Sequence, residues 1–410
     1  MSRRVPLFAL VAASGIASAG LSMTLIAIPW FALQSTGSGT KTGLVAAMEV
    51  LGLLLSAVLG GPLVDRLGPR GVSVGADLLT TLAVGLVPLA HATVGLPLPG
   101  LLALTFLMGA CRGPADTAKQ VLLAQVVELV GTPAGRAASL VEAANRIGKM
   151  IGAPLAGALI AFVGPVNVLF ADATTLLSSA TLVLLLIPAA ARVAGEKTGG
   201  YLADLGEGLA YVRRDRLLLA IVGMLMLTNG LDTGLSGVLY PAYGSEVLHS
   251  SALLGVMVTA LGAGAVLGSM LYGWIGHRFS RWGTYVVCFL VEGAPRFALL
   301  ALKPSPVVLL IGLGVAGLGS GLLNPILLPV VYERVPEHLR GRVFSLLVAG
   351  ALAVIPVGTL LAGVLLDGIG LTGVLLTFGA VYLVATTFPL VFRVWRQLDA
   401  RAGEPVLARS

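Results

Sequence analysis

Long apolar stretches, separated by short polar segments, follow one another along the whole chain. Each has about 20 residues or more, enough to cross the hydrocarbon core of a bilayer as a helix. Their apolar residues run almost without interruption, whereas the strands of an outer-membrane barrel would alternate at every second position. The expected spans are about 7–34, 42–64, 71–91, 98–122, 137–162, 166–189, 217–244, 252–276, 283–302, 306–331, 343–366 and 372–395. The pattern predicts an all-α membrane protein with twelve transmembrane helices in two six-helix bundles.

The composition also favours a membrane protein over a soluble one. Of the 410 residues, 57% are hydrophobic and only 11% are charged, against about 25% charged in soluble domains. The first stretch follows Ser2-Arg3-Arg4 but is longer than the apolar core of a signal peptide, so we expect it to be retained as a span. Cys111 and Cys288 lie inside apolar stretches, so no disulfide framework is indicated.

The distribution of basic residues sets the expected orientation. With the N-terminus inside, cytoplasmic segments hold 19 of the 26 Lys and Arg residues, and external loops hold only Lys41 and Lys303. An excess of positive charge on the cytoplasmic side is the usual topological signal. We therefore expect a multi-pass protein of a prokaryotic cytoplasmic (plasma) membrane with both termini in the cytoplasm. The pI of 9.7 then reflects contact with anionic lipid and requires no nucleic-acid partner.

A polar segment between the sixth and seventh spans divides the chain into two halves. It predicts an N-terminal six-helix bundle over 1–190, a cytoplasmic linker over 191–216, a C-terminal six-helix bundle over 217–395 and a cytoplasmic tail over 396–410. Within the linker, Tyr201–Tyr211 has the pattern of an amphipathic helix at the membrane surface.

The two halves resemble each other in sequence. Matching positions recur at an offset of 206 residues late in each half and of 212 residues earlier. Two parallel six-span repeats are typical of transporters that work by alternating access, with the substrate site near the middle of the membrane. The matches are Gly135–Leu140 with Gly341–Leu346, Leu155–Gly157 with Leu361–Gly363, Gly164 with Gly370, Pro29 with Pro241, and Gly61–Arg66 with Gly273–Arg278.

The loop between the second and third spans carries the most specific motif. It reads Gly61-Pro-Leu-Val-Asp65-Arg66-Leu-Gly68-Pro-Arg70. This resembles the gating motif of the major facilitator superfamily, G-x-L-a-D-r-x-G-r-k, with Pro69 in a place that is usually basic. A degenerate copy at 273–282 has His277 instead of the acidic residue. The resemblance covers essentially the whole chain and implies the fold of that superfamily. The matching positions are Gly61, Leu63, Asp65, Arg66, Gly68 and Arg70.

The resemblance implies a gating role for this loop. Asp65 and Arg66 would bridge the cytoplasmic ends of the two bundles. An acid placed near Gly341 would also interact favourably with the N-terminus of the eleventh span. Such a latch would favour the outward-facing state; the alternative is a solvated charged turn.

A second resemblance lies in the fifth span. Gly148-Lys-Met-Ile-Gly152-Ala-Pro154-Leu-Ala-Gly157 is similar to a Gly- and Pro-rich motif of exporters, although Ala153 separates Gly152 from Pro154. The same residues are equally typical of a packing seam, in which small side chains let two helices approach closely. The runs Pro114–Ala118 and Asn145-Arg146 resemble the branch of macrolide-type efflux pumps and siderophore exporters.

Twelve ionisable residues lie within the expected spans, where each unpaired charge costs about 2.5–3.5 kcal/mol at the helix centre. Six of them form two stripes of three residues each, one on the fourth span and one on the fifth. Matching depths predict contacts of Lys119 with Glu142 and of Asp116 with Arg146, with two positive charges in excess unless Asp77 or another acid reaches in. A structural network and a cavity-lining patch that binds an anion are both open. The stripes are Arg112, Asp116 and Lys119, and Glu142, Arg146 and Lys149.

Acids outside these stripes include two candidates for proton coupling, Asp232 in the seventh span and Glu49 in the second. A carboxylate left alone there would have to bind a cation or a proton. Glu292 and Arg296, at i and i+4, are expected to neutralise each other, and Asp77 and Asp172 are expected to be structural.

In the superfamily the first, fourth, seventh and tenth spans line the central cavity. The resemblance therefore implies a substrate-facing set of Ser18, Ser22, Asn229, Asp232, Ser236, Tyr240 and Asn324.

The sequence therefore predicts a secondary active transporter, a proton-coupled exporter of small amphiphilic or drug-like compounds. Three alternatives remain: a lipid or lipid-precursor flippase, an importer of a small anionic metabolite, and a membrane sensor without transport activity. No Gly-x4-Gly-Lys-Ser/Thr sequence occurs and the four His have no metal-ligand spacing, so we expect no enzyme, cofactor or metal site. The expected partners of this monomer are the substrate, protons and membrane lipids.

Overall fold

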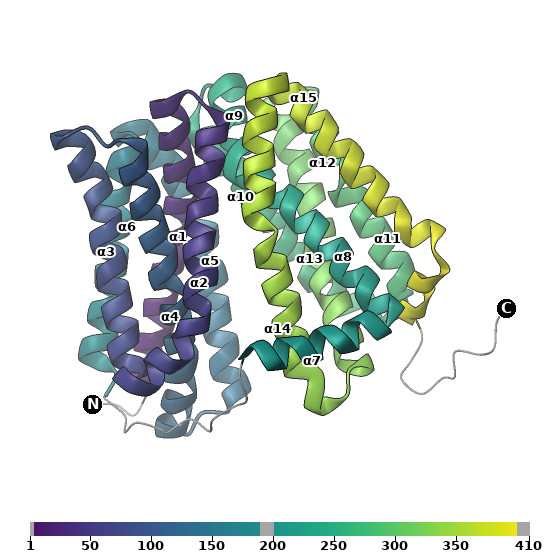
Figure 1. Ribbon diagram of the computed structural model, residues 1–410, viewed down its shortest axis with the longest axis horizontal. Coiled ribbons are helices and arrows are strands. Elements are labelled where there is room, and N and C mark those ends of the chain that lie inside the picture. The colour runs from purple at the N-terminus through teal and green to yellow at the C-terminus, as the bar shows by residue number, and fades with distance from the viewer. Residues whose placement is uncertain (1–3, 189–200, 400–410) are drawn as a thin grey trace. The chain divides into compact units, whose positions relative to one another are not determined.

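The computed structural model of the chain describes residues 4–188 and 201–399. Within these ranges the chain is almost entirely helical and contains no strand (Figure 1). The helices cluster into two compact units. The predicted all-helical membrane fold is confirmed.

Within the described residues, eleven helical stretches are long and apolar enough to cross a membrane. The last, Leu339–Val391, has 53 residues, which would rise about 80 Å as one helix, against a hydrocarbon core of about 30 Å. Gly370 interrupts this stretch with φ 71° and ψ 169°. The spans expected at 343–366 and 372–395 lie on either side of that break, and the count of twelve stays a prediction.

The first unit comprises Met1–Lys197, Thr233–Thr259 and Ile355–Gly368. In it α1 packs against α5 and α6, while α4 packs against α2 and α3, and α3 packs against α6. Consecutive helices are therefore often not the closest neighbours. The bounds are α1 (Val5–Thr36), α2 (Gly39–Leu67), α3 (Pro69–Thr93), α4 (Leu98–Val130), α5 (Ala134–Val163) and α6 (Pro165–Leu186).

The second unit comprises Thr198–Asp232, Ala260–Val354 and Ile369–Ser410. Three of its helices (α8, α10 and α15) have residues in both units. Leu235–Leu239 (π-helical), α9 (Tyr240–Tyr243) and Gly244–Leu248 (π-helical) lie between α8 and α10 and belong to the first unit. The bounds are α7 (Tyr201–Arg214), α8 (Arg216–Gly234), α10 (Ser251–Ile275), α11 (Arg281–Glu292), α12 (Ala294–Ala301), α13 (Pro306–Arg334), α14 (Glu337–Ala353) and α15 (Ile355–Val391).

A helix, α7, occupies the segment predicted to be amphipathic. The Tyr211 hydroxyl donates to the Arg334 carbonyl at 2.9 Å, and Glu207 pairs with Arg342. The rest of the linker, 191–200, and the tail from 400 to 410 lie outside the described residues. The predicted boundaries at 190, 216 and 395 stay predictions.

The sequence repeat has a counterpart in the backbone. Gly164, between α5 and α6, has φ 83° and ψ 158°. Its sequence match Gly370 has nearly the same conformation, with φ 71° and ψ 169°. Only glycine adopts a positive φ of this kind without strain. The two halves therefore use the same turn at matched positions.

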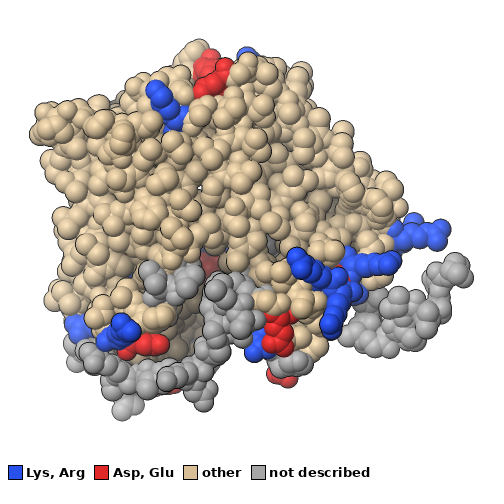
Figure 2. Space-filling view, viewed as in Figure 1, with Lys and Arg blue, Asp and Glu red and all other residues tan. Residues whose placement is uncertain are grey.

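The surface of each unit suits a lipid environment. Charged side chains gather toward the helix ends, and a broad band between the ends is free of them in the visible face (Figure 2). Large apolar side chains point outward along this surface, among them Leu82, Trp274 and Ile311. So much exposed apolar surface would promote aggregation in water, and in a bilayer it contacts acyl chains.

Candidate functional site

A cavity of about 360 Å³ lies inside the first unit, with walls from all six of its long helices. Uncharged groups on its wall include Ser14, Ser18 and Thr80, besides apolar side chains. Eight charged residues also line it: the acids Glu49, Asp77, Asp116, Glu142 and Asp172, and the bases Arg112, Lys119 and Lys149. Acids outnumber bases by five to three, so negative charge prevails when all are ionised.

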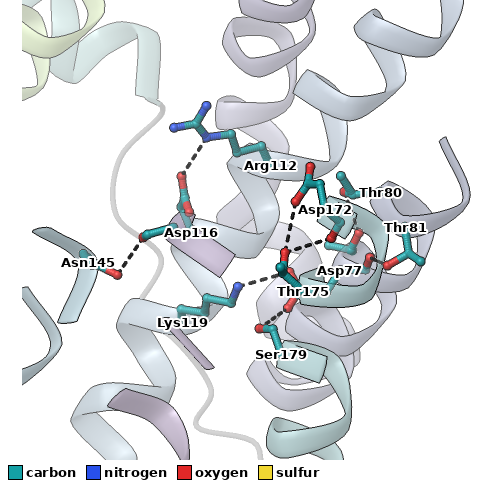
Figure 3. A network of polar contacts seen from close by, with 12 residues as sticks. Asp77, Thr80, Thr81, Arg112, Asp116, Lys119, Asn145, Asp172, Thr175 and Ser179 are labelled. Atoms are coloured by element: carbon teal, nitrogen blue, oxygen red, sulfur yellow. Dashed lines mark hydrogen bonds and ion pairs between the residues drawn. The ribbon is translucent and has the colours of Figure 1, made fainter. Parts of the chain in front are cut away.

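Arg112 on α4 lies between two carboxylates. Its Nη1 is 3.9 Å from Glu49 Oε1. Its Nε is 3.8 Å from Asp116 Oδ2 (Figure 3). The Glu49 side chain is only 14% exposed, whereas that of Asp116 is 60% exposed. Glu49 is thus one of the acids that offset the expected surplus of positive charge.

Lys119 pairs with Asp77 on α3. Its Nζ is 3.1 Å from Asp77 Oδ1, while the Ser179 hydroxyl on α6 donates to Asp77 Oδ2 at 2.8 Å (Figure 3). The predicted contact of Lys119 with Glu142 is therefore wrong. The reason is that α4 packs mainly against α2 and α3, whereas α5 packs mainly against α1. The structural role expected for Asp77 agrees with these contacts.

On α5, the charges pair along the helix. Arg146 Nε is 2.8 Å from Glu142 Oε1, at i and i+4, and both side chains are more than half exposed. The predicted contact of Asp116 with Arg146 is wrong as well, because Asp116 faces Arg112 on its own helix. Lys149 lines the cavity.

Asp172 on α6, which was expected to be structural, lies on the cavity wall. It is 2% exposed, accepts a hydrogen bond from Thr24 on α1, and accepts a second from Thr175 at 3.0 Å. The spacing of Asp172 and Thr175 on one helix face was the available signal. Gly20 on α1 makes room for this carboxylate, since a Cβ there would lie 2.0 Å from Asp172 Oδ1.

The serines of α1 divide between the cavity and the helix interior. Ser18 lines the cavity and donates to Asn145 Oδ1 at 2.9 Å. Ser22 is buried and donates to the Ser18 carbonyl at 3.2 Å. Of the two serines predicted to face the substrate, Ser18 is therefore on the cavity wall, whereas Ser22 is not among the wall residues.

In the second unit, Asp232 belongs to a buried charged cluster. Arg296 Nη2 pairs with Asp232 Oδ1, and Arg296 Nη1 is 4.0 Å from Glu292 Oε1. Arg296 and Glu292 are only 4% and 6% exposed in their side chains, whereas Asp232 is 31% exposed. The predicted Glu292–Arg296 contact is present, but the view of Asp232 as an isolated carboxylate is wrong, because Arg296 reaches it from α12.

The other predicted substrate-facing residues do not form a single stripe. Asn229 donates to the Leu225 carbonyl of its own helix at 2.8 Å. The backbone is π-helical from Leu235 to Leu239, with more residues per turn than an α-helix. Residues before and after this segment therefore do not share the face that α-helical spacing would give them. Ser236 is exposed and Tyr240 is 4% exposed. The side chain of Asn324 lies outside the described residues.

The gating motif forms the end of α2 and the turn into α3. Asp65 and Arg66 are exposed on the last turn of α2, and Gly68 has φ 81°, which explains glycine at this place in the motif. Arg70 donates to the Leu184 carbonyl of α6. Gly61 lies within α2, and its burial is outside what the structure describes.

The glycine-rich segment of α5 is a packing surface. A Cβ on Gly148 would lie 2.2 Å from the Gly15 carbonyl oxygen of α1, and one on Gly152 would lie 2.3 Å from that of Ala19. A Cβ on Gly157 would lie 2.5 Å from the Ser251 carbonyl oxygen of α10. The segment that resembles an exporter motif thus brings α5 into backbone contact with two other helices.

Comparisons with known proteins agree with these features. A sequence profile described as Major Facilitator Superfamily matches residues 10–236 and again 222–408. The chain is 30% identical over 403 residues to "Multidrug efflux pump Tap" of Mycolicibacterium fortuitum, covering 97% of this chain and 98% of that protein. It is 27% identical over 362 residues to "Enterobactin exporter EntS" of Salmonella paratyphi A, covering 87% of this chain and 83% of the exporter.

Among solved structures, the nucleoside transporter NupG has a similar fold. It superimposes with a TM-score of 0.76 at 13% identity, over 94% of this chain and 98% of NupG. Both the profile and the relatives extend over nearly the whole length. The chain belongs to the major facilitator superfamily and is a membrane transporter of that family, similar to its drug and siderophore exporters.

Proposed function

We propose that this chain is a proton-coupled exporter of small amphiphilic compounds, and that it favours compounds with a positive charge. It works as a monomer in a bacterial cytoplasmic membrane by alternating access, with both termini in the cytoplasm. The names of the relatives support export of drug-like molecules. The repeated halves support alternating access.

The charge of the cavity is the observation that carries the preference for cations. Five acids and three bases line it, so an added organic cation would reduce the net charge, whereas an anion would increase it. Electrostatic interactions are strong where water is scarce. The acid surplus therefore argues against the importer of anionic metabolites, which rested on an excess of bases.

The Asp232 cluster is the proposed site of proton coupling in the second unit. Two carboxylates share one guanidinium, so the cluster carries a net negative charge unless one acid is protonated. A buried net charge is costly, and the cluster therefore favours holding one proton. Asp232, as the more exposed acid, exchanges it. Glu49, on the cavity wall beside Arg112, is the rival site.

The loop from Gly61 to Arg70 is proposed to be the cytoplasmic latch. The exposed carboxylate of Asp65 supports this role, because within the described residues it makes no hydrogen bond or ion pair and is available to another surface. In the first unit, the substrate pathway would include Ser18, which lines the cavity.

Dye efflux tests the proposal. Cells that express the chain should accumulate several-fold less ethidium, a lipophilic cation, than cells with empty vector, and should treat the anionic dye fluorescein alike with and without it. The Glu49→Gln and Asp172→Asn double variant should lose efflux of the cation at equal expression. Equal export of both dyes, or export of fluorescein alone, would refute the cation preference.

A further inference from the structure

A carboxylate from α15 caps the beginning of α2. Asp367 Oδ1 accepts a hydrogen bond from the Gly39 amide at 2.6 Å, and Oδ2 accepts from the Thr40 amide at 2.9 Å. The Ser38 hydroxyl also donates to Oδ2, at 2.8 Å. The first amides of a helix have no partner within the helix, and a negative charge is favourable at that end. One side chain therefore satisfies three donors at the start of α2.

Below this cap the two helices touch through their backbones. A Cβ on Gly43 would lie 2.4 Å from the Thr359 carbonyl oxygen, and one on Gly363 would lie 2.3 Å from the Gly39 carbonyl oxygen. Thr359, Gly363 and Asp367 are spaced by four residues and so share one face of α15. We call the contact of residues 38–43 with 359–367 the α2–α15 seam.

The seam joins segments that are far apart in sequence. Residues 38–43 belong to the predicted N-terminal bundle, and residues 359–367 to the predicted C-terminal bundle. The portion Ile355–Gly368 nevertheless clusters with the first unit. Gly370, with its positive φ, interrupts α15 just beyond that portion. The cap and the close backbone contact explain this attachment.

The seam lies at the opposite end of α2 from the gating motif. α2 runs from Gly39 to Leu67, so Asp367 and Asp65 mark its two ends. In alternating access the two bundles separate at one end of the pathway while they close at the other. A contact between them at either end must therefore break once in each cycle.

We propose that the α2–α15 seam is a latch that closes the external end of the pathway, with Asp367 as the residue that holds it. The inference rests on the proposed transport function and on the expected orientation, which puts residue 38 outside. The cap holds by hydrogen bonds that water can replace, so the latch can open reversibly.

The experiment measures the opening of the seam directly. Thr359 is 2% exposed beneath the cap and serves as the reporter position. Thr359→Cys is made in a background in which Cys111 and Cys288 are replaced by Ala, and the protein is placed in nanodiscs. The rate of reaction with a charged maleimide is then compared between this parent and variants of the latch.

Asp367→Asn should raise the labelling rate by about tenfold, because hydrogen bonds to a charged acceptor are stronger than those to a neutral one and the Asn amide cannot accept at both positions. Asp367→Glu, which keeps the charge, should fall between this variant and the parent. The control Glu246→Gln removes an exposed acid elsewhere in the first unit and should leave the rate unchanged. Gly363→Ala, which forces the helices apart, should raise the rate independently.

Unchanged labelling in a folded Asp367→Asn protein would overturn the latch. If Asp367→Asn and Gly363→Ala both fail to give folded protein by size-exclusion chromatography, the seam is a fixed structural contact and the proposal is also wrong. Labelling requires neither substrate nor a proton gradient. If Asp367→Asn is labelled faster but the chain exports no cation, the latch is supported and the proposed substrate is refuted. If the chain exports cations normally but labelling of Asp367→Asn is unchanged, only the latch is refuted.

Discussion

Asp77 shows how single residues balance the charges inside the first unit. Its side chain is 4% exposed, forms an ion pair with Lys119 and accepts a hydrogen bond from the Ser179 hydroxyl. Burying an ion pair is not itself stabilising, but removing one partner leaves an unpaired charge in a medium of low dielectric constant. The pair is therefore a point where a conservative change has a large effect.

We predict that Asp77→Asn and Lys119→Met each lower the free energy of unfolding by about 3–5 kcal/mol, and that the double variant loses less than the sum. Thermal or denaturant unfolding in detergent measures the effect. The matched cycle is Asp116→Asn with Arg146→Met, whose effects should add because each residue pairs along its own helix. Additive losses for Asp77 and Lys119 would contradict the pairing.

A second prediction concerns Asp232. Asp232→Asn keeps the size of the side chain and a hydrogen-bond partner for Arg296, but it removes the exchangeable proton. Substrate binding and passive equilibration should persist, and uphill accumulation driven by a pH gradient should be lost. Uptake into proteoliposomes with and without the gradient separates the two. Normal gradient-driven uptake by Asp232→Asn, together with its loss in Glu49→Gln, would move the coupling site to the first unit.

At the scale of elements, the approach of α5 to α1 depends on glycine. Gly148→Ala puts a methyl group 2.2 Å from the Gly15 carbonyl oxygen, and overpacking of this kind costs about 1–3 kcal/mol. We therefore predict a lower melting temperature for Gly148→Ala. Gly135→Ala in the same helix is the control, since nothing lies within 4 Å of its added Cβ. Equal melting temperatures for the two variants would show that the seam tolerates side chains.

The sequence predicted the elements well because their signals are local. Apolar length marks the spans, and Gly164 and Gly370 mark matched turns that the structure reproduces. The partners of the charged residues were not predictable in the same way. Depth matching assumed that α4 and α5 face each other, whereas α4 packs mainly against α2 and α3. The π-helical segment at Leu235–Leu239 likewise changed the faces expected from α-helical spacing.

At the scale of the whole molecule, the sequence repeat and the gating motif identified the superfamily, and the comparisons confirmed it. The α2–α15 seam could not be predicted from the sequence, because nothing local in residues 38–43 indicates that Asp367 will cap them. The cavity was only partly predicted for the same reason. Five of its charged residues belong to the predicted stripes, whereas Glu49, Asp77 and Asp172 come from three other helices.

The gating loop gives a prediction at this scale. Asp65→Asn should reduce the transport rate several-fold while expression and melting temperature stay close to those of the parent, since the exposed carboxylate has no partner among the described residues. Glu246→Gln, another exposed acid, should transport normally. Transport by Asp65→Asn at the wild-type rate would show that the loop is a solvated turn without a gating role.

Proton movement coupled to substrate is the most direct test of the central claim. The purified chain is reconstituted into liposomes that contain a pH-sensitive dye, and ethidium is added without any imposed gradient. If protons are exchanged for ethidium, the internal pH should rise as ethidium enters, because protons leave the liposomes. This rise should require ethidium and should be absent with Asp232→Asn. Ethidium transport without any pH change, or the same change from the Asp232→Asn protein, would contradict it.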